Sequence, residues 1–156
     1  MKTLIIAVSF VLLGLSAIGQ TVVNLNASTH TTTQTGCSYW FYDDGTVSGT
    51  YTNSQNRWIT FASSDAVNTH IKASFASFDI DPGDTLFIYD GPNTASPLIG
   101  AYNNNNPLTI PNTMVQASIA NVSGDLTFRF KTNASTVKDG WNCSIGCIPQ
   151  CQNILA

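Results

Sequence analysis

The chain has 156 residues, of which 43% are hydrophobic and only 10% are charged, and its formal net charge is −3. Six Lys and Arg residues against nine acidic residues leave no basic face for nucleic acid, so we expect no nucleic-acid partner. Low charge and abundant Thr, Ser and Asn favour a secreted all-β domain.

The N-terminus has the pattern of a signal peptide. A positive residue, Lys2, precedes an apolar run at 4–15, and the small residues of 17–19 follow it. The run is too short to span a bilayer comfortably, although a buried strand or a membrane anchor is the alternative. We predict that residues 1–20 are removed on export, that the mature chain does not insert into a membrane, and that the protein is secreted or lies at the cell surface.

The remaining sequence predicts short strands separated by turns, with no convincing helix. In chain order, the expected strands cover residues 21–25, 37–42, 57–61, 69–78, 84–91, 97–102, 115–119, 126–130 and a last segment around Trp141. In the 69–78 strand, polar residues alternate with apolar ones, and we expect His70 to lie on the solvated face. Strands at this spacing predict an antiparallel two-sheet β-sandwich.

The four cysteines fit an exported chain. Cys37 lies far from a C-terminal group formed by Cys143, Cys147 and Cys151. An even number in an oxidising compartment predicts disulfides, with three connectivities. Zinc is the alternative, but CxxC pairs and neighbouring histidines are missing. Cys143 and Cys147 share one face of a strand, so either could bond Cys37 and join the first strand of the domain to the last.

The sequence carries no catalytic motif. His30 and His70 are the only histidines, and neither lies in a nucleophile or metal motif. Asp43 and Asp44 are adjacent, but a glycosidase pair must face each other across a cleft, and we interpret these two as a hairpin turn. We predict that the protein is not an enzyme.

Several segments together resemble the CUB domain, an extracellular β-sandwich module, in its secreted bacterial, Bacteroidota-like form. They are Cys37–Gly45, Phe75–Ile80 (FASFDI), Asp84–Gly91 (DTLFIYDG), Pro97–Gly100 (PLIG), Leu126–Phe130 (LTFRF) and Gly140-Trp141. The resemblance implies a CUB-type jelly roll and a role in binding. We therefore expect an N-terminal strand and linker at 21–36, a CUB-like domain at 37–147, and a tail or the start of another module at 148–156.

The resemblance also implies a calcium site. The family's ligands correspond here to Asp81, Asp84 and Asn133, with Ser135 and Thr136 supplying further oxygens. Calcium binds six to eight oxygens, and Asn133 replaces an acid of the family pattern, which should weaken the site. The alternative is that the 81–84 segment is only a turn with polar caps.

The cysteines depart from the animal members of the family. Three of the four usual disulfide positions are occupied here by Asn56, Asp81 and Asn103. We expect a Cys37–Cys147 bond in their place, with Cys143 as the less favoured partner of Cys37. Cys143 would then pair with Cys151, unless Cys151 belongs to a following segment.

These features predict a secreted, non-enzymatic binding or adhesion module that contacts an extracellular protein or a glycan and forms part of a larger surface protein. Three aromatic residues, Tyr39, Trp40 and Tyr102, are the candidate binding surface. One alternative is a carbohydrate-binding module of a secreted hydrolase, in which exposed rings stack on sugars. Another is a spacer domain.

Overall fold

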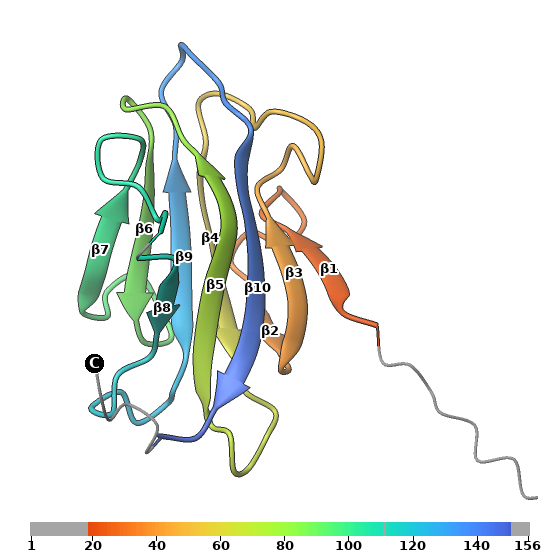
Figure 1. Cartoon of the computed structure of the whole chain (residues 1–156), viewed down its shortest axis with the longest axis vertical. Coiled ribbons are helices and arrows are strands. Elements are labelled where there is room, and N and C mark those ends of the chain that lie inside the picture. Colours follow the sequence, from red (N-terminus) through yellow and green to blue (C-terminus); the bar gives the residue numbers. More distant parts are fainter. Residues whose placement is uncertain (1–18, 111, 151–156) are drawn as a thin grey trace, which may run out of the picture.

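The computed structural model describes residues 19–110 and 112–150, which form two five-stranded sheets packed face to face (Figure 1). The strands are β1 (Thr21–Asn24), β2 (Thr33–Thr35), β3 (Ser38–Tyr42), β4 (Asn56–Ala62), β5 (His70–Asp79), β6 (Thr85–Asp90), β7 (Leu98–Tyr102), β8 (Met114–Gln116), β9 (Leu126–Lys131) and β10 (Gly140–Ile148). Nearly all of the predicted signal peptide, and Cys151 with the residues after it, lie outside this range. The described part of the chain has no helix long and apolar enough to cross a bilayer.

The first sheet has the order β1-β3-β10-β5-β8 and the second the order β2-β4-β9-β6-β7. Neighbouring strands are antiparallel except for β1 with β3 and β2 with β4, which are parallel. The predicted β-sandwich is confirmed, but its sheets are mixed. The chain passes from β1 through β2, in the opposite sheet, before it returns as β3, and such a crossover is what a parallel pair requires.

Aromatic side chains from both sheets fill the core. Phe41 of β3 lies 5.2 Å from Phe128 of β9, and Trp141 of β10 lies 5.0 Å from Phe130 of β9, measured between ring centroids. Both pairs meet edge to face, the arrangement that the ring quadrupoles favour. These contacts hold the two sheets together.

The predicted alternation of β5 is confirmed on its inner face, where Ile71 and Ala73 are fully buried. The expectation that His70 is solvated is wrong, because only 2% of it is exposed. The loop before β9 covers it: the Ile71 amide donates to the Gly124 carbonyl at 2.8 Å, and Gly124 packs against the His70 backbone. Strand alternation cannot reveal a covering loop that comes from 50 residues away in the sequence.

The Cys37–Cys147 disulfide is confirmed, with a Cα–Cα distance of 5.0 Å. It joins the start of β3 to β10, where Ser38 lies opposite Gly146 in the antiparallel register. Cys143 is a free thiol, fully buried in the core, and this differs from the predicted Cys143–Cys151 pair. Because β10 directs Cys143 inward, between the sheets, its sulfur faces core side chains.

Candidate functional site

Four loops meet at one end of the sandwich, at the top of Figure 1, and we call this the loop end. They follow β3, β5, β7 and β9 and comprise residues 43–55, 80–84, 103–110 and 132–139. Two of the loops, 43–55 and 132–139, are bonded through their backbones: the Tyr51 amide donates to the Lys138 carbonyl at 3.1 Å, and the Ser54 amide donates to the Asn133 carbonyl at 2.7 Å. The Asn104 amide donates to the Ile80 carbonyl at 2.9 Å and joins the other two loops to each other.

Asp84 lies at the centre of these loops and is 1% exposed. Its Oδ2 accepts a hydrogen bond from the Tyr51 hydroxyl at 2.7 Å, and its Oδ1 accepts one from the Asn133 amide N–H, also at 2.7 Å. A buried carboxylate is costly unless donors satisfy both oxygens, and here donors from two other loops do so. Asp84 is therefore the residue that fixes these loops relative to one another.

Tyr51 is a functional residue that the sequence analysis missed. Its hydroxyl donates to Asp84 and also accepts the Asp81 amide N–H at 3.0 Å, while its ring packs edge to face on Phe130. Burial, followed by the nearby Asp84 and Asp81 charges, raises the pKa of Tyr51 above its ordinary value. An isolated tyrosine in a polar loop gives no signal in the sequence, because its partners lie about 30 residues away along the chain.

The structure brings four of the five predicted calcium ligands together. Asp81 Oδ1 and the Asn133 amide both lie beside Gly83, where a Cβ would overlap Asn133 and come within 3.2 Å of Asp81. Ser135 donates to Asn133 Oδ1 from its backbone N–H and from its hydroxyl, each at 2.7 Å. Thr136 is exposed in the same loop.

These ligands fit calcium in chemical type, because all of them are oxygens and two are carboxylates. Because Gly83 has no side chain, the space that borders Asp81 and Asn133 stays open. However, the Asn133 Oδ1 is already bonded to Ser135, and its amide nitrogen is the atom that faces Gly83. Within the described residues, no three His, Cys, Asp or Glu side chains cluster as metal ligands.

Asp43 does not form the predicted hairpin turn, since β3 and β4 belong to different sheets. It is fully buried and accepts backbone N–H groups from Gly45 at 2.7 Å and from Trp141 at 3.1 Å. It therefore joins the end of β3 to the start of β10. Burial is the main cause that raises the pKa of Asp43 to about 6, against the opposing effect of these two bonds.

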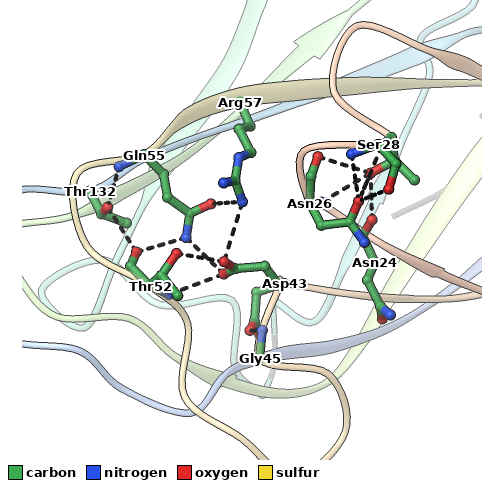
Figure 2. Close-up of polar contacts among 11 residues, drawn as sticks. Asn24, Asn26, Ser28, Asp43, Gly45, Thr52, Gln55, Arg57 and Thr132 are labelled. Carbon is green, nitrogen blue, oxygen red and sulfur yellow. Dashed lines mark hydrogen bonds and ion pairs between the residues drawn. The ribbon is translucent and has the colours of Figure 1, made fainter.

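Asp44 accepts hydrogen bonds that organise the neighbouring loop, and it does not face Asp43 as one half of a carboxylate pair. Thr52, Gln55 and Arg57 converge on its carboxylate. Figure 2 shows these three side chains gathered together beside the Asp43 and Gly45 segment. The Arg57 Nη1 lies 3.3 Å from Asp44 Oδ2, while the Thr52 hydroxyl donates at 2.6 Å. Burial opposes ionisation, but these hydrogen bonds and the Arg57 charge outweigh it and hold the pKa of Asp44 below its ordinary value.

A groove of about 310 Å³ opens at the loop end, between the 43–55 loop and the start of β10. The loop contributes Val47, which is 72% exposed, and the facing wall carries the carboxylates of Asp79 and Asp139. An exposed aliphatic side chain beside acidic groups gives this groove both an apolar and a charged part.

The predicted aromatic binding surface is not one surface. Tyr39 is only 9% exposed, and it packs on Phe61 in the core at 5.5 Å, so its assignment as a surface residue is wrong. Tyr102 is half-buried against the core. Trp40 is half-buried in β3, next to Tyr39 in the chain and therefore on the opposite, outer face of the first sheet. Sequence alternation cannot tell which of two adjacent aromatic residues points inward.

Solved structures that are similar to this chain include two extracellular proteins. One is the full extracellular region of zebrafish Gpr126/Adgrg6, with a TM-score of 0.57 and 14% identity over 75% of this chain and 14% of that one. The other is the CUB1-EGF-CUB2 domain of human MASP-1/3, with a TM-score of 0.56 and 17% identity over 74% of this chain and 40% of that one. No protein-family model and no curated protein matches the sequence. The described chain thus has a CUB-like β-sandwich fold, as its sequence predicted.

Proposed function

We propose that this protein is a secreted binding module that contacts another extracellular protein through its loop end and does not catalyse a reaction. The observation that carries the proposal is the buried Asp84, which is bonded to donors from two other loops. Loops fixed in this way are pre-organised, so binding a partner costs little conformational entropy. The CUB-like fold and the Cys37–Cys147 disulfide support an extracellular role.

The groove beside Val47 is the proposed contact surface. A partner would cover the exposed Val47 side chain and place a cationic side chain against Asp79 or Asp139. Apolar contact at the centre with charges at the rim is the usual composition of a protein interface.

Calcium binding is a second part of the proposal. Asp81, Asp84 and Asn133 would supply side-chain oxygens, with Ser135 and Thr136 adding neutral ones. When bound, the ion would add positive charge between the 80–84 and 132–139 loops. With only two carboxylates, we expect affinity in the weak range of extracellular calcium modules.

An array of immobilised extracellular proteins and glycans, probed with the mature chain, tests the function. We expect saturable binding to a protein, and the Val47→Asp variant should lose that binding with an unchanged melting temperature. Val122→Asp, at a 92% exposed residue before β9, is the matched control and should bind normally. Binding to glycans alone would support the carbohydrate-binding alternative, and no binding to any probe would support a spacer domain.

Thermal unfolding in millimolar calcium and in EDTA tests whether the protein binds calcium. Calcium should raise the melting temperature of the parent protein and of Asp139→Asn, but should have a smaller effect on Asp81→Asn. Asp139 is the control because it is an exposed carboxylate of the same loop end. An unchanged melting temperature of the parent protein in calcium would contradict a calcium site.

A further inference from the structure

The outer face of the second sheet carries a row of two aromatic rings with a cation between them. In the strand register, Arg129 of β9 lies directly opposite Trp58 of β4 on one side and Phe87 of β6 on the other. The strand neighbours Ile59, Phe128 and Ile88 are fully buried in the core. Because successive side chains of a strand alternate between faces, all three residues of the row point away from the core.

The row reaches solvent and is held in place. Trp58, Phe87 and Arg129 are each partly exposed. The Arg129 Nε donates to Asn56 Oδ1 at 2.8 Å, which fixes the guanidinium. His30 packs edge to face on Trp58, with ring centroids 4.3 Å apart, and supports that ring from the side of the 25–32 segment.

A second cation extends this row toward the loop end. Lys131 is exposed and lies between Asn56 and Thr85 in the register. A hollow of about 290 Å³ lies next to it, lined by Phe87, Lys131, Thr85, Thr132, Gly83 and Asn133. We call Trp58, Phe87, Arg129 and Lys131, with this hollow, the basic face.

The cations of the basic face have no carboxylate partner. The one ion pair among the described residues joins Arg57 to Asp44, at the loop end. The two acids that contact lining residues of the hollow accept backbone N–H groups instead: Asp81 Oδ1 from Gly83 and Asp84 Oδ1 from Asn133. In a chain with a net charge of −3, two unpaired cations on one face create a local site for an anion.

The lower part of the same sheet face is closed. The Thr60 hydroxyl donates to the Pro92 carbonyl at 3.2 Å and the Thr127 hydroxyl donates to the Gly91 carbonyl at 2.8 Å, so the loop after β6 covers it. The part of this sheet face that is open to solvent is therefore confined to two rows of paired residues, Trp58–Arg129–Phe87 and Asn56–Lys131–Thr85.

We propose that the basic face binds an acidic polysaccharide. Carboxylate or sulfate groups would pair with Arg129 and Lys131, and the planar guanidinium of Arg129 is especially suited to binding such groups. Sugar rings would stack on Trp58 and Phe87. The two aromatic residues are two strands apart, hence about 9–10 Å, which is close to the length of a disaccharide. A chain of alternating acidic and neutral sugars would thus place a charge between the rings. An acidic peptide would need the cations but not the paired rings.

This site lies on a different surface from the groove of the proposed function and takes a different ligand, so each can fail without the other. The Val47→Asp variant should bind polysaccharide normally. Asn133, a predicted calcium ligand, lines the hollow, but the two rings, Arg129 and Lys131 need no metal to bind an anion, so binding should persist in EDTA.

Binding of the mature chain to polygalacturonate, chondroitin sulfate, neutral dextran and polyglutamate tests the proposal, with biolayer interferometry at low and moderate salt. We expect saturable binding to one or both acidic polysaccharides and none to dextran. The Arg129→Gln/Lys131→Gln variant should bind about tenfold more weakly. Lys72→Gln removes a cation from the outer face of the opposite sheet and should bind normally.

A ring-specific variant separates a polysaccharide from a peptide. Phe87→Leu keeps an apolar side chain but removes the ring, so it should weaken polysaccharide binding. Three results would overturn the proposal: no binding to either acidic polysaccharide, polyglutamate binding as tight as polysaccharide binding, or an equal loss in Lys72→Gln. Melting temperatures confirm that each variant is folded.

Discussion

Asp43 and Asp44 are adjacent in the sequence, yet the structure gives them opposite electrostatic environments. Asp43 is fully buried between β3 and β10, and Gly140, with φ of +71°, lies in direct contact with its carboxylate. Asp44 is bonded to Thr52, Gln55 and Arg57. The pKa of Asp43 is therefore raised to about 6, mainly by burial, while the pKa of Asp44 is lowered.

These two shifts predict opposite pH dependences of stability. Asp43 has a higher pKa in the folded than in the unfolded chain, so its contribution is fully present below the unfolded value and is lost as pH rises through about 6. The stability advantage of the parent protein over Asp43→Asn should fall by up to about 3 kcal/mol between pH 4 and pH 7.

Urea unfolding of the parent protein, Asp43→Asn and Asp44→Asn between pH 4 and pH 7 measures how the free energy of unfolding depends on pH. Asp44→Asn is the matched control with the opposite sign, because the contribution of Asp44 is present above its unfolded pKa and is lost as pH falls through the lowered folded value. A pH-independent difference between the parent protein and Asp43→Asn would refute the assignment.

Strand β10 contributes to strand pairing, to the core and to the disulfide. It pairs with β3 on one side and with β5 on the other, and it contributes Trp141, Cys143 and Ile145 to the core. Its last part carries Cys147, which bonds Cys37 across 110 residues of sequence. The disulfide therefore closes nearly the whole sandwich into one covalent loop.

Removal of the disulfide should destabilise the protein strongly. A loop of this length restricts the unfolded chain, and we expect Cys37→Ala/Cys147→Ala to lose about 3 kcal/mol of unfolding free energy. Thiol labelling of Cys143 is the control that the core is folded. Cys143 is fully buried, and burial raises the pKa of its thiol. We therefore expect Cys143 to react with a labelling reagent only after unfolding. Rapid labelling of Cys143 in the native protein would contradict the described core.

At the scale of the whole molecule, the first two strands belong to the sandwich. Val23 and Leu25 are 6% and 0% exposed and join the core, and β2 pairs with β4. The CUB resemblance covers the chain only from Cys37, whereas the described fold extends back to Thr21.

A chain that begins at Cys37 should therefore be less stable than one that begins at Thr21. The loss of the two buried side chains alone should cost about 4 kcal/mol, and it would also uncover the edges of β3 and β4. Urea unfolding of both chains measures this, and equal unfolding free energies would mean that the first two strands are dispensable.

Most strands could be predicted because alternation is local. In β5, residues 71, 73 and 75 carry the pattern themselves, and turn residues mark the ends of neighbouring strands. The parallel pairing of β1 with β3 and of β2 with β4, and the burial of His70, could not be predicted in this way. Both depend on which segments from elsewhere in the chain lie against these residues.

The candidate site was found only in part. Asp81, Asp84 and Asn133 were placed by the family resemblance, and the structure brings them together with Ser135. Tyr51, which completes the Asp84 contacts, carries no local signal. The basic face was also missed, because Trp58, Phe87 and Arg129 come from three strands that become neighbours only in the sheet.

By itself, the sequence determined the β class, most strand positions and the position of Cys37 near the first strand of the domain, since these follow from periodicity and turn chemistry within short segments. Only the tertiary structure decided which aromatic rings face the core, which of two adjacent carboxylates is buried, and which cysteine reaches Cys37. The physical reason is that burial and pairing depend on contacts between residues 30 to 110 positions apart.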